Sequence, residues 1–161
     1  YGHSVPVISN RLQSSGKEFA GEIVAYDPDG EEKEIAMRIE GAYESIWGLD
    51  KALRTLQLTP EGELVLEDEF RLSRVALPVE EAVVTWLDTT VDGSRAVIAG
   101  EKNDLELTIE APEGAAFKLE VLEEASKANN KERILKRLSF TGKPADKDLT
   151  MRLRAKVTPK S

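Results

Sequence analysis

The sequence contains a single histidine, His3, directly before a strand-like run from Ser4 to Ser9. An imidazole can exchange a proton near neutral pH, and it is also a common metal ligand. A zinc site needs three or four ligands, so His3 could form one only with residues from elsewhere. A serine-based triad would also have to use it. His3 is therefore the first candidate for acid–base or metal chemistry, and the alternative is an ordinary surface histidine.

Other side chains offer weaker candidates for chemistry. Cysteine is absent, and the sequence has neither a glycine-rich phosphate loop nor a Gly-x-Ser-x-Gly elbow. Asp68 is predicted to be a solvated or hydrogen-bonded acid on a strand. Tyr26 and Tyr43 are predicted to pack in the core or in cross-strand pairs. Trp47 and Trp86 could form a platform for sugar stacking, but the apolar run around Trp86 favours core packing for that residue.

The composition indicates one soluble globular domain. The chain has 161 residues, of which 40% are hydrophobic and 32% charged, and it has no apolar run long enough to cross a membrane. The net charge of −8 argues against a nucleic acid partner, because phosphate binding needs a basic surface. No initiator Met or signal-peptide pattern is present. We therefore expect residues 1–161 to be a single domain taken from a longer protein.

The charge is distributed unevenly along the chain. Residues 1–120 hold 11 basic and 25 acidic side chains, whereas residues 121–161 hold 11 basic and 5 acidic ones. The basic end could bind an acidic polymer or an acidic neighbouring domain, or it could be an ordinary solvated surface. Alternation along one strand would place three of these cations on the same face. The basic residues in question are Lys131, Arg133, Lys136, Arg137, Arg152, Arg154 and Lys156.

These residues must be positioned by strands, because apolar and polar residues alternate through most of the chain. Five pairs of alternating runs flank turns that contain Gly or Pro: 21–26 and 33–40, 54–58 and 63–72, 81–88 and 95–100, 104–110 and 116–124, 133–140 and 148–157. This spacing predicts an all-β fold, an antiparallel sandwich of two packed sheets with ten or eleven strands and little helix. We expect a loop with one helical turn at 43–53, and a turn leading into a strand at 126–138.

The run HSVPVISNRLQ (3–13) resembles the His-Asn-Val-Pro-x-Ile-Asn-Gly-x-x-Gln signature of the heparinase II/III-like polysaccharide lyases. The run LRTLQLTPEGELVLEDEF (53–70) resembles a strand–turn–strand segment of the same family. The likeness extends along the chain as a pattern, but these two runs carry it. The sequence departs from the signature at Ser4, where the family has Asn, and at Ser9-Asn10, where the family has Asn-Gly.

The resemblance implies the C-terminal β-sandwich domain of a lyase that cleaves uronic-acid-containing polysaccharides by β-elimination. It implies a periplasmic or secreted protein whose N-terminal helical toroid domain is absent from this chain, so that the chain alone is not catalytic. The expected partners are an acidic polysaccharide and that helical domain, with no nucleic acid and no membrane.

The resemblance also assigns candidate site residues. His3 matches a cleft histidine that serves as a zinc ligand in some members of the family. The remaining ligands would lie upstream, so a zinc is expected in the intact protein and none in this fragment. Arg11 and Gln13 are candidates for substrate binding, or alternatively for capping the strand. The competing hypothesis is a non-catalytic carbohydrate-binding or structural β-sandwich.

Overall fold

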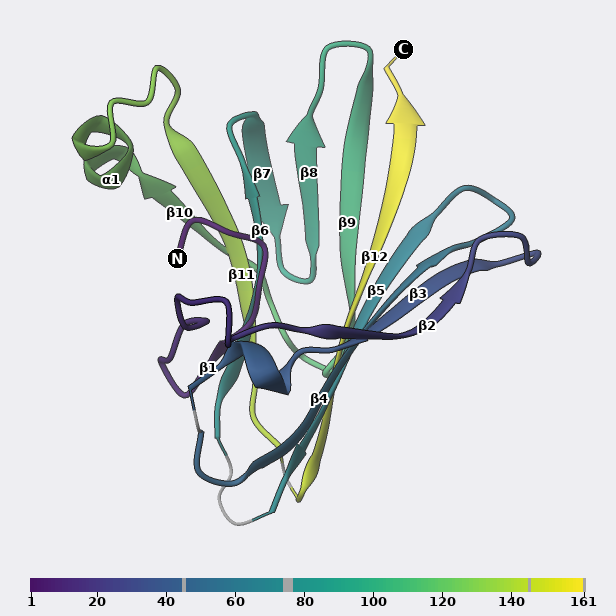
Figure 1. Cartoon of the computed structure of the whole chain (residues 1–161). Coiled ribbons are helices and arrows are strands. Elements are labelled where there is room, and N and C mark those ends of the chain that lie inside the picture. Colours follow the sequence, from purple (N-terminus) through teal and green to yellow (C-terminus); the bar gives the residue numbers. More distant parts are fainter. Residues whose placement is uncertain (45, 74–76, 145, 161) are drawn as a thin grey trace.

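Two antiparallel sheets packed face to face make up the fold (Figure 1). A computed structural model describes residues 1–44, 46–73, 77–144 and 146–160. The small sheet has the order β1 (Val7–Ile8), β6 (Val79–Thr85), β11 (Leu135–Gly142) and β10 (Lys118–Leu122). The large sheet has the order β2 (Glu22–Asp27), β3 (Lys33–Arg38), β4 (Leu49–Leu58), β5 (Leu64–Leu72), β12 (Asp148–Pro159), β9 (Asn103–Ala111), β8 (Arg95–Ala99) and β7 (Asp88–Asp92).

The predicted all-β antiparallel sandwich is confirmed, with 55% of residues in strands and 6% in helices. The described residues form twelve strands rather than ten or eleven. They also form a 3-10 turn, η1 (Glu40–Ala42), and one short α-helix, α1 (Glu123–Ala128). The helical turn thus lies just before the segment 43–53 where it was expected. The segment 126–138 begins in α1 before it leads into β11.

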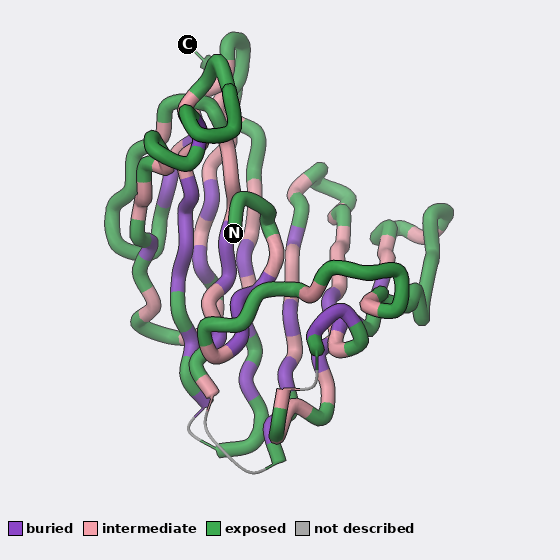
Figure 2. The backbone as a smooth tube through the Cα atoms, turned by 60° about the vertical axis from the view of Figure 1, so that its left-hand side comes forward, coloured by how far each residue is buried: buried purple, intermediate pink, exposed green. Residues whose placement is uncertain are grey.

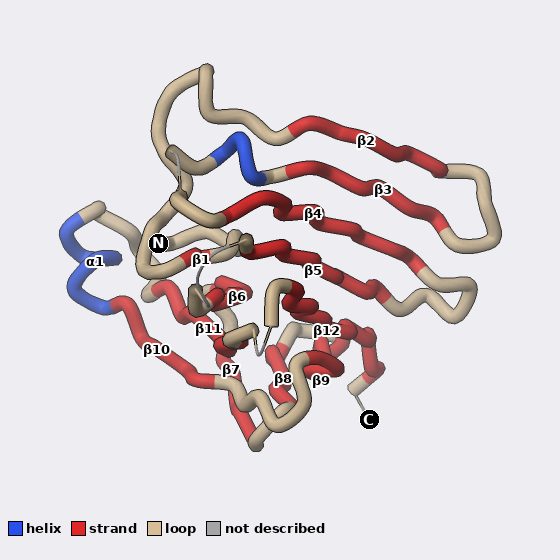
Figure 3. The backbone as a smooth tube through the Cα atoms, turned by 90° about the horizontal axis from the view of Figure 1, so that it is seen from below, coloured by secondary structure: helices blue, strands red, loops and turns tan. Residues whose placement is uncertain are grey.

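The hydrophobic core lies between the small sheet and the concave side of the large one. Figure 3 shows the large sheet as a curved row of strands with the small sheet along its inner side. Phe117 and Phe140 meet edge to face there, with their ring centroids 5.8 Å apart. Leu138, Met151 and Val79 are fully buried in the same core. Interdigitation of the two inner faces is the usual basis of stability in a sandwich.

Two of the five pairs of runs form hairpins as they stand, β2–β3 and β4–β5, and the Asp92-Gly93 turn closes a third hairpin, β7–β8. The run 81–88 divides at Trp86: β6 belongs to the small sheet, and β7 pairs with β8 in the large one. β9 and β10 lie in different sheets, as do β11 and β12. A turn with Gly or Pro reverses the chain whether or not the next strand remains in the same sheet, so the pattern alone does not distinguish the two outcomes.

Strand β2 forms one edge of the large sheet, and all six of its residues are exposed (Figure 2). Ile23, Val24 and Tyr26 are 61%, 47% and 69% exposed, so Tyr26 faces solvent even though it pairs with Ile35 on β3. The pairing register shifts between Ile23 and Ala25, which leaves Val24 as an extra residue. This is the geometry of a β-bulge, which bends an edge strand and increases its twist.

Candidate functional site

His3 is exposed in an N-terminal segment that contacts the small sheet at several points. The Tyr1 hydroxyl donates to Glu120 Oε2 at 2.5 Å, and its ring lies 4.2 Å from the guanidinium carbon of Arg137. The Ser4 hydroxyl accepts from the Val84 N–H at 3.1 Å. These contacts on both sides of His3 fix the backbone that presents the imidazole.

The segment ends in a tight turn at Ser9-Asn10. Ile8 and Arg11 exchange two backbone hydrogen bonds, of 3.1 and 2.9 Å. Ser9 and Asn10 have φ angles of 50° and 61°. Two central residues with positive φ are typical of a type I′ turn, which Asn-Gly adopts most readily. Ser9-Asn10 thus forms the tight turn even though it departs from the Asn-Gly of the signature.

Beneath this segment lies a buried ionic cluster that joins the two sheets. Arg54 on β4 donates two hydrogen bonds to Asp68, its cross-strand partner on β5, with Nε to Oδ1 at 2.8 Å. Arg54 Nη2 also donates to Glu81 Oε2 of β6 at 2.9 Å. Asp68 is 0% exposed, Glu81 2% and Arg54 8%. Such a bidentate pair is among the stronger interactions of a protein interior.

The cluster also holds the His3 segment in place. Arg54 Nη1 donates to the Ser4 carbonyl at 3.0 Å, so one guanidinium contacts both sheets and the N-terminal segment. Nearby, the buried Tyr43 hydroxyl donates to the Pro6 carbonyl at 2.6 Å. Burial is the main cause that raises the pKa of Tyr43, with the Glu81 carboxyl adding to it. Tyr43 therefore stays a neutral donor, as expected for a core tyrosine.

Glu81 differs from Asp68 because it makes fewer hydrogen bonds. Its Oε1 has no hydrogen-bond partner within the described part of the chain. Burial, followed by the charge of Asp68, holds the pKa of Glu81 well above its ordinary value near 4.5. Arg54 opposes this shift only in part. The surroundings of Glu81 thus favour its protonated form, and in that form Arg54 and Asp68 remain as a neutral pair.

The raised pKa of Glu81 predicts a specific dependence of stability on pH. The folded protein keeps a proton that an unfolded Glu releases near pH 4.5, so the free energy of unfolding falls as pH rises from there toward the folded pKa. Glu81→Gln keeps the neutral form, so we expect its stability relative to wild type to increase over this range, by at most about 1.4 kcal/mol per pH unit. Urea denaturation of both proteins between pH 4.5 and 9 measures this difference in the free energy of unfolding.

The control for this experiment is Glu61→Gln at an exposed turn position. Its stability relative to wild type should stay nearly constant over the same pH range. A Glu81→Gln protein that tracks wild type at every pH would show that Glu81 is ionised in the fold.

A pocket of about 720 Å³ opens beside His3, on the outer side of the small sheet. Its polar and aromatic lining includes Tyr1, His3, Trp86, Asn129 and Lys131. Trp86 is 53% exposed, so the prediction that it packs in the core is wrong. The reason is that Trp86 follows the last residue of β6, at the corner where the chain leaves the small sheet for the large one.

Arg11 and Gln13 do not line this pocket. Both are exposed, and Gln13 interacts with the Tyr43 hydroxyl. Its neighbour Ser14 accepts the Glu44 N–H at 2.8 Å, which attaches the segment to the region around Tyr43. The structure therefore separates His3 from Arg11 and Gln13, and the role of all three in substrate or metal binding stays a prediction.

Among residues 1–44, 46–73, 77–144 and 146–160, no three His, Asp or Glu side chains lie close enough together to hold a metal ion. The described residues therefore do not fit zinc by themselves, and a role of His3 as a zinc ligand stays a prediction. No helix in the same residues is long and apolar enough to span a membrane.

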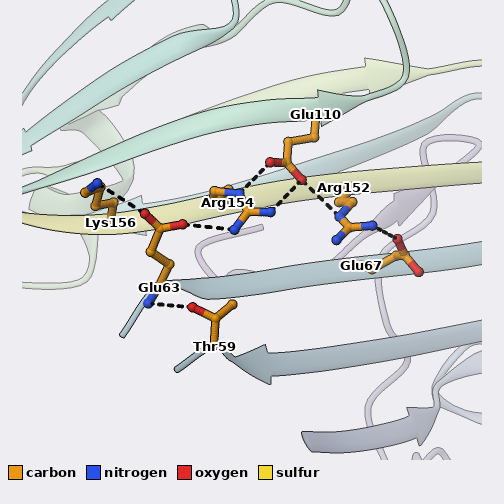
Figure 4. Close-up of polar contacts among 7 residues, drawn as sticks. All are labelled: Thr59, Glu63, Glu67, Glu110, Arg152, Arg154 and Lys156. Carbon is orange, nitrogen blue, oxygen red and sulfur yellow. Dashed lines mark hydrogen bonds and ion pairs between the residues drawn. The ribbon is translucent and has the colours of Figure 1, made fainter. Parts of the chain in front are cut away.

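The basic face of β12 is neutralised by glutamates of the neighbouring strands (Figure 4). Arg152 pairs with Glu67 and Glu110, at 3.2 and 3.0 Å. Arg154 pairs with Glu110 and Glu63, at 2.5 and 2.9 Å. Lys156 pairs with Glu63 at 3.3 Å. Alternation does place the three cations on one face, but three carboxylates balance them.

The other basic residues of this end differ in whether they form ion pairs. Lys136 pairs with Asp88 at 3.0 Å, and Arg137 is buried against Glu80 at 2.7 Å. Lys131 and Arg133 are exposed in the connection from α1 to β11, with no ion-pair partner within the described part of the chain. The basic end therefore does not form one continuous cationic surface.

This pairing predicts that the β12 face contributes little to binding of an anionic polymer. The double substitution Arg154→Gln with Glu110→Gln removes one charge of each sign and keeps the net charge. We expect the salt concentration at which the chain elutes from heparin resin to stay the same, because a paired cation releases no counterion on binding. Elution at distinctly lower salt would show that Arg154 contacts the polymer.

The fold has clear counterparts among solved structures. No family model matches the sequence, and the search of curated proteins gave no match. Over 99% of this chain, the structure matches the heparan sulfate lyase HepC from Pedobacter heparinus with a TM-score of 0.77 and 10% identity. It matches heparinase III, the BT4657 gene product, with a TM-score of 0.73 and 14% identity.

The chain has the heparinase III sandwich fold. The resemblance to the C-terminal β-sandwich of these lyases, inferred from residues 3–13 and 53–70, is thereby confirmed at the level of the fold. The match covers 24% of each of the two lyase chains, so this chain spans about a quarter of their length. At these identities the heparinase III fold carries over, whereas activity does not follow from the match.

Proposed function

We propose that this chain is the β-domain of a polysaccharide lyase that cleaves uronic-acid-containing polysaccharides by β-elimination. In this proposal it lines the substrate cleft and presents His3 to it. The main support is the match of the whole chain to part of heparinase III and of HepC. The resemblance of residues 3–13 to the lyase signature adds to it. The exposed position of His3 beside a pocket agrees with this role.

The proposed chemistry breaks the linkage between two sugar units without water. A base removes the proton α to the uronate carboxyl, its electron pair forms the carbon–carbon double bond, and the bond from the sugar to the 4-oxygen breaks. An acid returns a proton to that oxygen, so the two products together equal the substrate. An imidazole suits this cleft because it can exchange a proton or bind an anion near neutral pH. Tyr1 and Lys131 also line the pocket beside His3. In this proposal the base and the acid of the reaction include groups outside this chain, so the chain alone is expected to be inactive.

We further propose that the missing groups come from a helical domain that precedes this one in the intact protein. A zinc, where present, would bind His3 together with ligands from outside this chain, and it would supply a positive charge. This chain itself contributes the position of His3. Contacts of Tyr1, Ser4 and Arg54 hold the backbone on both sides of that residue.

The test is the formation of unsaturated uronate by the intact protein and by this chain on a panel of uronic acid polymers, followed by ultraviolet absorbance. We expect product from the intact protein and none from the chain alone. Product from the isolated chain would contradict the proposal that cleavage needs groups from outside this chain. An intact protein that binds these polymers without cleaving them would instead be a non-catalytic carbohydrate-binding protein.

A further inference from the structure

The pocket beside His3 has a lining unlike the rest of this acidic chain. Asp and Glu make up 30 of 161 residues, yet within the described part of the chain none of them lines the pocket. The ionisable side chains that do line it are Tyr1, His3 and Lys131. A pocket with an ammonium and an imidazole but no carboxylate is suited to an anionic ligand.

A further buried cation lies directly below Tyr1. Arg137 is 1% exposed, and its Nη1 pairs with Glu80 at 2.7 Å. Its Nε and Nη2 have no hydrogen-bond partner among the described residues. The ring of Tyr1 covers this guanidinium at 4.2 Å from its carbon atom. Because Glu80 balances its charge, Arg137 acts mainly as a support for the Tyr1 ring in the wall of the pocket.

The lining of the pocket suits a ring with one apolar face. Val84, Leu122 and Leu135 form its apolar part, and the half-exposed indole of Trp86 stands beside them. The corner that carries Trp86 is held by hydrogen bonds: Leu87 N–H to Thr85 Oγ1 at 3.1 Å, and Lys136 Nζ to the Leu87 carbonyl at 3.1 Å. A pyranose presents a face of C–H groups that stacks on such a fixed aromatic ring.

Polar groups at the rim complete the match to a sugar. Asn129 donates from Nδ2 to the Ala125 carbonyl at 2.8 Å, a bond that does not use its side-chain oxygen. Lys131 follows two residues later, and its ammonium is free of ion pairs within the described residues. The volume of about 720 Å³ lies within the range of pockets that bind small molecules, about 300–1,000 Å³.

We propose that this pocket is a subsite for one acidic sugar unit, a uronate or sulfated pyranose, of a bound polysaccharide. Trp86 stacks on the ring, Lys131 pairs with the carboxylate or sulfate, and Asn129 accepts a hydroxyl. The proposal deepens the proposed function, on which the choice of an acidic sugar rests. It also assigns to this domain a binding activity of its own, separate from cleavage.

The experiment titrates this chain with a heparan sulfate tetrasaccharide and, separately, with neutral chitotetraose. Tryptophan fluorescence is recorded in a Trp47→Phe background, so that Trp86 alone reports. We expect a saturable change with the acidic tetrasaccharide and at least about tenfold weaker binding of the neutral one, a factor within the reach of one charged contact. Equal affinity for both, or no binding of either, would overturn the proposal, and the latter would indicate a surface for contact with another domain.

Substitutions locate the binding, and isothermal titration calorimetry measures it because it does not require Trp86. Trp86→Ala and Ala125→Trp, which fills the pocket from the exposed side of α1, should each weaken binding about tenfold or more. Lys131→Ala should weaken it and lower its salt dependence, whereas Lys102→Ala on the β8–β9 turn should change neither. Unchanged affinity in both Trp86→Ala and Ala125→Trp would place the ligand elsewhere.

These results are separable from the test of lyase activity. Binding by this chain together with an intact protein that fails to cleave would keep the subsite and reject the proposed lyase function. Cleavage by the intact protein together with no binding by this chain would keep the proposed lyase function and reject the subsite.

Discussion

Replacement of Arg54 by alanine is expected to lower the free energy of unfolding by about 3–5 kcal/mol, the usual cost of removing one partner of a buried ion pair. Asp68 would remain fully buried without its bidentate donor, and the Ser4 carbonyl would lose its hydrogen bond. Domains of this size have about 5–15 kcal/mol of stability in total, so the variant would be close to unfolding. Urea denaturation of the chain provides the measurement.

Two further variants keep this prediction testable if Arg54→Ala does not fold. Asp68→Asn keeps the volume and part of the hydrogen bonding, so we expect a smaller loss of stability. Arg38→Ala on neighbouring β3 removes an exposed Arg that pairs with Glu22, and we expect little change in the free energy of unfolding. If Arg54→Ala and Arg38→Ala cost the same, the buried cluster does not hold the sheets together.

Substitution of His3 by alanine in the intact protein is expected to reduce product formation about a hundredfold or more, the usual effect of losing an acid–base group. The side chain is exposed, and the backbone around it is held by Tyr1, Ser4 and Arg54, so the fold should be unaffected. Initial rates of unsaturated uronate formation measure the effect, and circular dichroism verifies the fold.

The matched control for His3 is Lys17→Ala, a change at another exposed position of the N-terminal region that lies outside the proposed site. Its rates should equal those of wild type. A His3→Ala protein within threefold of wild type would remove His3 from the mechanism. A rise in KM with unchanged kcat would show that His3 binds substrate without taking part in the chemical step.

The sequence indicates the local part of this fold well. The alternation within β4 and β5 predicts the hairpin between them, and it also places Arg54 and Asp68 on the face shared with Ala52 and Phe70. Two opposite charges on buried faces are a signal that pattern reading could have used to find the cluster. Glu81 could not be found in this way, because nothing local indicates which strand of the second sheet lies opposite Arg54.

The non-local part of the candidate site is also hidden in the sequence. The pocket combines His3 with Trp86 at a sheet-crossing corner and with Lys131 after α1, three segments far apart in the chain. The glutamates opposite β12 are a similar case, because their partners depend on strand order. From the sequence alone, the basic residues of β12 suggest a cationic surface. In the fold, Glu63, Glu67 and Glu110 lie beside them and pair with them.

The bulge in β2 bears on how the chain behaves at high concentration. An edge strand with unpaired N–H and C=O groups is a template on which a strand of a second molecule can add. In β2 this hazard is increased by the exposed side chains of Ile23, Val24 and Tyr26. The extra residue Val24 breaks the regular spacing of backbone groups, so an incoming strand cannot form a continuous ladder along this edge. The extra residue in β2 therefore disfavours edge-to-edge association, in which strands of further molecules would extend the large sheet.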